Sequence, residues 1–215
     1  MEDSTSKEKI LKKIRKALIN KSPKQYTAID LESEIFVQPS ESLEIAFAEA
    51  FTDVSGKFIF CVDSVDFAEN INYLMADNNW QEVYCNEPIL QHLLTKSGIT
   101  YTSTPDDLLN TTISVTSCEY LVARTGSILV SSKNSGRKTI IRPPVHMVIA
   151  YASQLVPDIK DALRNIKQKY DNNLPSFISF ITGPSRTADI EKTLIIGAHG
   201  PKELYMFLID DIKEA

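Results

Sequence analysis

Side chains that could do chemistry are concentrated in two neighbouring segments near the carboxyl end of the chain, Gly183–Glu191 and Gly197–Pro201. Three of the seven glycines, two of the ten prolines and one of the three histidines lie there. Glycine and proline at this density indicate a backbone that ordinary residues cannot adopt. Because polar and charged side chains of both signs sit on that backbone, these segments are the first candidate for a functional site.

Residues 183–187 have the composition of an anion-binding loop. Gly183 opens a glycine–proline turn, and Ser185, Arg186 and Thr187 follow with two hydroxyls and a guanidinium. Such a set, with free backbone N–H groups, suits a carboxylate or a phosphate. An alternative remains open, in which Ser185 or Thr187 caps a short helical turn and Arg186 pairs with a nearby acid.

His199 and Asp189 are the candidate catalytic residues. His199 lies between Ala198 and Gly200 and could act as a general acid or base near neutral pH. Asp189 could orient either that histidine or Arg186. The alternative for His199 is a structural role, in which its ring bonds to loop carbonyls.

Two further segments could contribute to ligand binding. Thr125 and Gly126 join two expected strands, where Gly126 would permit a close approach of ligand to backbone. His146 follows two prolines at the start of another expected strand, a plausible rim of a site. An ordinary bend between strands would equally explain Gly126, and His92, in a helical pattern between leucines, is expected to serve packing.

Composition excludes several classes of protein. A hydrophobic content of 43% and a charged content of 24% are ordinary for a globular protein with a core. The formal net charge of -5 argues against a dedicated nucleic-acid surface. We find no apolar run of the roughly 20 residues that cross a bilayer, and no apolar signal segment at the start, so we expect a cytoplasmic protein.

The cysteines give no sign of a metal or redox centre. Cys61, Cys85 and Cys118 are far apart and form no Cys-x-x-Cys pair, so we expect no metal and no cofactor bound by this chain. We interpret them as small buried apolar side chains.

Helical and strand-like patterns alternate from residue 42 to residue 101. This alternation predicts βαβ units, a parallel sheet and the α/β class. The next section, from residue 113 to residue 150, carries closely spaced strand patterns, and a turn at 134–136 predicts a β-hairpin over residues 127–142. A helix over 158–170 and strands over 177–181 and 203–209 complete the prediction.

The amino-terminal part has a different pattern. Residues 7–20 carry apolar residues at helical spacing with lysines on the other face, and residues 21–40 are polar and read as a linker. We expect an amphipathic helix or arm over residues 1–22 and one α/β domain over residues 41–215. The helix could touch a membrane, although packing on its own domain or on a second subunit fits its narrow apolar stripe better.

The polar segments occur in the order that is typical of the LUD domain. The segments that carry this resemblance are Thr125–Ser127, Arg142–His146, Gly183–Glu191 and Gly197–Pro201. Within that family the chain resembles the lactate utilization protein C (LutC/YkgG) type, specifically over residues 113–210 and more loosely towards residue 1. The resemblance implies a sheet similar to that of the NagB/RpiA/CoA-transferase fold. It also implies a role in bacterial oxidation of L-lactate to pyruvate, with two partner proteins that carry the iron–sulfur clusters.

Two positions depart from the family pattern, and one of them reverses a charge. The position before Thr125, commonly glutamate in the family, is Arg124 here, and Ser127 replaces a second threonine. Serine preserves the hydroxyl, but arginine reverses the charge, so no proton-transfer role is carried over to this position.

Three hypotheses follow from these patterns. In the first, the chain is a LUD-domain subunit or accessory factor of lactate oxidation that binds a small carboxylate or phosphate. In the second, it is a stand-alone enzyme on the same fold, acting on a sugar phosphate or an acyl-CoA. In the third, it is a non-catalytic assembly module that docks through the helix at 7–20, and a homo-oligomer is compatible with each.

Overall fold

The computed structural model describes residues 5–19, 41–190 and 193–212, and it divides the chain into two separate units, residues 1–37 and 38–215. The expected linker over residues 21–40 lies outside the described residues. In the first unit, residues Ser6–Ile19 form helix α1, which agrees with the predicted helix. All other described elements belong to the second unit.

The second unit alternates helices and strands over its first half, as predicted from the sequence. Its helices are α2 (Leu43–Asp53), α3 (Ser64–Asp77), α4 (Pro88–Lys96), α5 (Asp107–Asn110), α6 (Arg137–Ile141) and α7 (Ile159–Lys169), with single 3-10 turns η1 (Ala123–Thr125) and η2 (Ala152–Gln154). Its strands are β1 (Lys57–Cys61), β2 (Val83–Tyr84), β3 (Tyr101–Thr102), β4 (Ile113–Thr116), β5 (Tyr120–Val122), β6 (Ser127–Ser131), β7 (Val145–Tyr151), β8 (Leu155–Val156), β9 (Ile178–Ile181), β10 (Arg186–Ile190), β11 (Thr193–Ile196) and β12 (Glu203–Ile209).

Helix starts follow the local sequence. The Asp63 carboxylate accepts hydrogen bonds from the backbone of Val65 (2.7 Å) and Asp66 (2.9 Å) and so caps α3. Asp158 caps α7 in the same way, and Pro88 occupies the first turn of α4. The sequence therefore determines where these helices begin without help from distant contacts.

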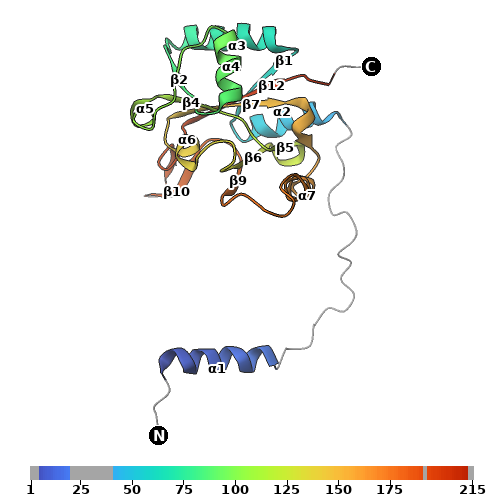
Figure 1. Cartoon of the computed structure of the whole chain (residues 1–215), viewed down its shortest axis with the longest axis vertical. Coiled ribbons are helices and arrows are strands. Elements are labelled where there is room, and N and C mark those ends of the chain that lie inside the picture. The colour runs from blue at the N-terminus through green and yellow to red at the C-terminus, as the bar shows by residue number, and fades with distance from the viewer. Residues whose placement is uncertain (1–4, 20–40, 191–192, 213–215) are drawn as a thin grey trace. The chain divides into compact units, whose positions relative to one another are not determined.

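The described strands form a six-stranded parallel sheet in the order β1-β12-β7-β4-β2-β3 and a four-stranded mixed sheet in the order β8-β5-β6-β9. Helices α3 and α4 lie on one side of the large sheet, whereas α2 and the small sheet lie on the other (Figure 1). Helix α7 packs on the outer side of the small sheet. The predicted α/β fold with a parallel sheet flanked by helices is confirmed.

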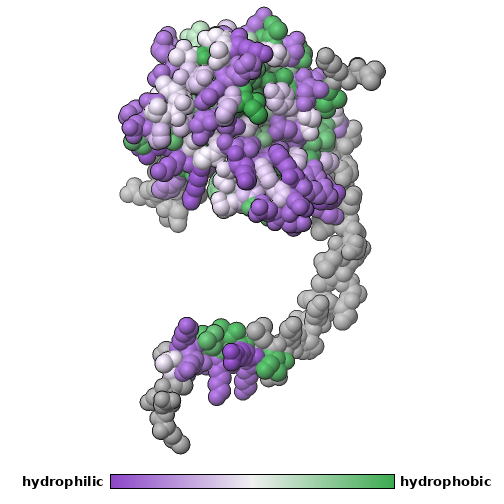
Figure 2. Space-filling model, viewed as in Figure 1, coloured by the Kyte–Doolittle hydropathy of each residue, from purple (hydrophilic) through white to green (hydrophobic). Residues whose placement is uncertain are grey.

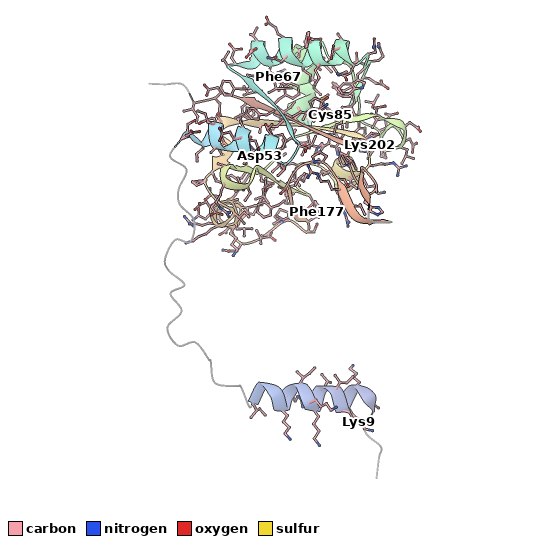
Figure 3. The ribbon with its side chains drawn as sticks, turned by 180° about the vertical axis from the view of Figure 1, so that it is seen from behind. Lys9, Asp53, Phe67, Cys85, Phe177 and Lys202 are labelled. Atoms are coloured by element: carbon pink, nitrogen blue, oxygen red, sulfur yellow. The ribbon has the colours of Figure 1, made fainter. Side chains whose placement is uncertain are left out.

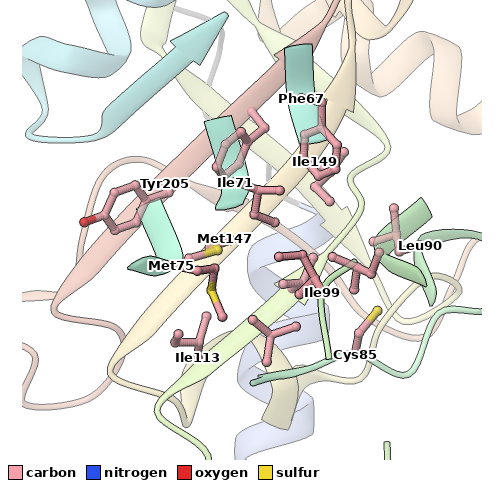
Figure 4. Packing of buried hydrophobic residues seen from close by; sticks show 14 of the residues in the cluster. Phe67, Ile71, Met75, Cys85, Leu90, Ile99, Ile113, Met147, Ile149 and Tyr205 are labelled. Carbon is pink, nitrogen blue, oxygen red and sulfur yellow. The ribbon is translucent and has the colours of Figure 1, made fainter. Parts of the chain in front are cut away.

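The large sheet is buried on both faces because apolar side chains alternate along its central strands. In β12, Tyr205 and Phe207 join the core beneath α3 and α4, whereas Met206 and Leu208 join the core beneath α2. Figure 4 shows the first of these cores, and in Figure 3 the labelled Phe67 and Phe177 mark the opposite sides of the sheet. Residue 146 belongs to the side that faces α2, because its neighbours 145 and 147 face the other.

Two local predictions were wrong. The expected hairpin over residues 127–142 does not form, because the chain turns after β6 and continues into the short helix α6 over Arg137–Ile141. The antiparallel neighbours of β6 are β5 and β9 instead. The alternative of a helix start after Gly183 is also wrong, because Arg186–Ile190 is strand β10, paired antiparallel with β11.

Candidate functional site

Three of the polar segments found in the sequence meet at the amino ends of β7 and β12. The backbone N–H of Ser185 donates to the carbonyl of Pro201 at 2.9 Å, and the N–H of Gly197 donates to the carbonyl of Ser185 at 2.9 Å. The N–H of Lys202 donates to the carbonyl of Pro144 at 2.7 Å. These bonds hold the loops around residues 144, 185 and 200 together as one structure, and Lys202 lies at the base of the β10–β11 hairpin in Figure 3.

A cavity of about 220 Å³ lies between these loops and the large sheet. Its polar side chains come from His146, Thr182, Ser185 and His199. The remaining lining residues are Ile140, Ile141, Phe180, Ile181, Gly183, Pro184, Gly200, Pro201 and Leu204. The cavity is therefore mainly apolar with a few polar groups, which is the usual character of a small-ligand site.

His146 is the most informative residue of this cavity. Its side chain is fully buried on β7, and its Nε2 lies 2.8 Å from the Oγ1 of Thr116 on β4. Its Nδ1 is buried and has no hydrogen-bond partner among the described residues. Burial lowers the pKa of His146 to about 3, so the ring is neutral at physiological pH. A neutral imidazole with one unused nitrogen can donate or accept one hydrogen bond from a ligand.

Ser114 adds a second unsatisfied group beside this ring. It lies opposite His146 in the register of β4 and β7, and its hydroxyl is also buried without a partner among the described residues. Buried polar groups are normally hydrogen-bonded, and each exception calls for an explanation. Ser114 and His146 are two such exceptions on neighbouring strands. This part of the sheet therefore carries polar groups that folding itself does not need.

Ser185 and His199 lie on the loop side of the cavity. His199 is exposed and Ser185 is half-buried. Gly200 allows the two loops to approach each other, because a Cβ on it would lie 3.0 Å from the Cβ of Ser185. His199 is therefore the histidine of this site that solvent reaches.

Gly183 is required by the backbone at the entrance to this loop. Its φ is +75°, and a Cβ there would lie 2.2 Å from the carbonyl oxygen of Val54. Both the left-handed conformation and the close approach exclude a larger residue. The loop therefore lies directly against the end of α2.

Arg186 also contacts the end of α2. Its Nη2 donates to the carbonyl of Val54 at 3.0 Å and to the hydroxyl of Ser55. It does not line the cavity, so its guanidinium holds β10 to α2 in this structure. Thr187 pairs with Ile195 in the hairpin, and the side chain of Asp189 lies outside the described residues.

Thr125 reaches the cavity only through other hydroxyls. Its Oγ1 lies 2.8 Å from the Oγ of Ser127, which lies 2.8 Å from the Oγ1 of Thr182 on the cavity wall. Gly126 has a φ of +57°, and a Cβ there would lie 2.4 Å from the backbone nitrogen of Phe51. The structure places this glycine against α2 rather than at the cavity.

Arg124, at the position that departs from the family pattern, pairs with Asp158. Its Nε and Nη2 donate to the two carboxylate oxygens at 2.9 and 2.8 Å. This bidentate pair lowers the pKa of Asp158, chiefly through the hydrogen bond from Arg124. Arginine at this position thus joins η1 to the first turn of α7.

Sequence reasoning missed Thr116, Ser114 and Thr182 as part of this site. Thr182 precedes Gly183 directly and could have been found by that adjacency. Thr116 and Ser114 carry no local signal, because only the register of β4 against β7 brings them to His146.

A sequence model of the LUD domain matches residues 5–209 of this chain. The chain belongs to the LUD domain family. Within the family, this LUD-domain chain is distantly homologous to curated lactate utilization proteins C. It is 38% identical to the one from Bacillus licheniformis over 102 residues, which cover 46% of this chain and 42% of that protein. It is 37% identical to the one from Bacillus subtilis over the same length and the same shares.

The match spans less than half the length of these curated relatives. The solved structure of a DUF162 family protein from Deinococcus radiodurans has a TM-score of 0.62 and covers 78% of this chain and 96% of its own, at 16% identity. That likeness shows that the two chains share a fold. In the described part of the LUD-domain chain, no helix has the length and apolarity to cross a membrane.

Proposed function

We propose that this LUD-domain chain is a subunit or accessory factor in the oxidation of L-lactate to pyruvate. Its homology to lactate utilization proteins C supports this role. In the proposal, the chain is cytoplasmic and binds no cofactor itself, and iron–sulfur partner proteins hold the redox metal. We also propose that its parallel sheet is of the NagB/RpiA/CoA-transferase type.

The cavity at His146 is proposed to bind a small organic acid of the size of lactate or pyruvate. The observation that carries this proposal is the buried, unpartnered Nδ1 of His146, a residue that lines the cavity. A ligand hydroxyl or carbonyl would complete the bonding of that nitrogen. The carboxylate would lie on the loop side, where Ser185 and His199 line the cavity.

The other predicted site residues have roles that depend on this arrangement. Gly183 and Arg186 hold the loop against α2 through the contacts with Val54. His199 would lie at the carboxylate end of the ligand as the candidate general acid or base, with Asp189 orienting it. Thr125 and Gly126 would support the cavity wall without touching the ligand. Thr187 would contribute through its place in the β10–β11 hairpin.

The test is isothermal titration calorimetry with L-lactate and with pyruvate. We expect His199→Ala to weaken binding at least about tenfold, because it removes a charged or hydrogen-bonding partner of the carboxylate. The matched control is His92→Ala, which removes an exposed histidine from α4, away from the cavity. Equal affinities in the two variants would contradict the assignment of His199.

A second candidate function, assembly through α1, is favoured by the surface of that helix. Ile10, Leu11 and Ile14 are 59%, 43% and 49% exposed. Figure 2 shows apolar side chains along one side of α1 and hydrophilic ones on the other. In this proposal, α1 is the element through which the chain docks onto its partner proteins.

A further inference from the structure

A second cavity lies at the opposite ends of the large sheet, beyond the carboxyl ends of β2, β4 and β7. These three strands are adjacent and parallel. After β2 the chain enters α4 on one side of the sheet, and after β4 it enters β5 on the other side. Neighbouring strands whose connections leave to opposite sides open a crevice between them, and open α/β sheets bind ligands in such crevices.

The crevice contains a cavity of about 360 Å³, larger than the one at His146. Its apolar wall comes from both cores of the domain, with Leu90 and Ile149 from one and Cys118 from the other. The other lining residues are Glu87, Pro88, Ile89, Ser117, Lys133, Asn134, Tyr151, Gln154 and Lys169. No residue of the four polar segments identified in the sequence lines this cavity.

Glu87 joins the chain segments that follow β2 and β4 at the crevice. It is 8% exposed, and its carboxylate accepts hydrogen bonds from the backbone N–H of Ser117 at 3.0 Å and from the Ser117 hydroxyl. Burial raises the pKa of Glu87 above its ordinary value. A carboxyl group held in this way presents a fixed hydrogen-bonding group on one side of the cavity.

Two lysines, Lys133 and Lys169, also line the cavity. The Nζ of Lys169 donates at 2.7 Å to Glu119, whose carboxylate also accepts from Ser131 and Tyr170, so a buried acid balances this lysine. Lys133 is exposed, and its ammonium makes no ion pair with any described residue. An unpaired cation therefore stands at the mouth of a largely apolar cavity.

We propose that this crevice is a second binding site, for an organic anion with an apolar or planar body. The carboxylate or phosphate of the ligand pairs with Lys133, its body lies against Leu90 and Ile149, and a polar group of that body meets Glu87. The site is independent of the cavity at His146 and of the proposed role in lactate oxidation.

The experiment is a two-dimensional amide NMR titration of the full chain with phenyl phosphate, benzoate and inorganic phosphate. We expect shifts of the amides of Cys118 and Ile149 with at least one of the two aromatic anions, and weaker ones with inorganic phosphate. The aromatic anion that binds more tightly identifies the class of the ligand, phosphate ester or carboxylate.

Lys133→Gln should weaken that binding at least about tenfold, because it removes the unpaired cation without disturbing a buried contact. Lys138→Gln, which removes an exposed lysine of α6 that does not line the cavity, is the matched control and should leave the affinity unchanged. His199→Ala should also leave it unchanged, which separates this site from the proposed lactate site. Absence of shifts with both aromatic anions, or an equal loss in both lysine variants, would overturn the proposal.

Discussion

A single buried histidine has consequences for stability as well as for ligand binding. His146 is fully buried and bonded to Thr116, and burial keeps its ring neutral. In the unfolded chain the same ring would titrate near pH 6.5. Folding therefore has to remove a proton from this residue in mildly acidic solution.

The free energy of unfolding should therefore depend on pH through the titration of His146 in the unfolded chain. Because the pKa of His146 falls to about 3 on folding, the unfolded state binds more protons between that value and about pH 6.5, and stability decreases as the pH falls through this window. His146→Gln, whose amide does not titrate, should flatten this dependence. Urea unfolding of both proteins from pH 7 to pH 4 measures it, and identical slopes would contradict the burial of a neutral ring.

At the scale of elements, the β10–β11 hairpin depends on its contact with α2. Gly183 and Arg186 both meet the carbonyl of Val54, which belongs to the unsatisfied end of that helix. This contact fixes Ser185 beside the cavity. The hydrogen bond from the Ser185 N–H to the Pro201 carbonyl in turn fixes the loop that contains His199. The geometry of the site thus rests on the end of one helix.

A pair of glycine variants should separate backbone strain from this contact. Gly98 and Gly183 both have a φ of +75°, but a Cβ on Gly98 would meet nothing within 4 Å. Gly98→Ala should therefore cost only the strain of a left-handed alanine, about 1 to 2 kcal/mol. Gly183→Ala should cost about 1 to 3 kcal/mol more, because the methyl group overlaps the Val54 carbonyl. Chemical denaturation measures both, and equal losses would show that the hairpin is not held tightly against α2.

At the scale of the whole molecule, the chain divides into two units, residues 1–37 and 38–215. The hydrophobic clusters of the described residues all lie within residues 43–209, so the α/β unit carries its own cores. The apolar side of α1 is exposed in the structure. In the proposed role, the first unit serves assembly.

Removal of residues 1–37 should test this division. We expect the shortened chain to keep the urea midpoint of the full chain, because no described cluster loses a residue. If α1 is the docking element, the same deletion should abolish co-purification with iron–sulfur partners. A clearly lower midpoint would show that the α/β unit depends on the first 37 residues, and retained co-purification would remove α1 from the assembly proposal.

The sequence alone predicted most elements of the α/β unit, because helix caps and hydrophobic periods are local properties. It failed at Arg137–Ile141, where a run of β-branched residues resembles a strand but forms a five-residue helix too short to show a period. It also failed at β10, because pairing with β11 decides that conformation and local propensity does not.

For the site, the residue types and their order in the chain were enough to indicate the loops at 183–187 and 197–201. Only the tertiary structure showed that Arg186 binds the end of α2 and that His146, which lines the cavity, keeps an unpartnered buried nitrogen. The same holds for the crevice at Glu87, whose lining residues are separated by up to 82 positions (87 to 169). The physical reason is that motifs record local chemistry, whereas burial, strand register and the meeting of strand ends depend on contacts between residues far apart in the chain.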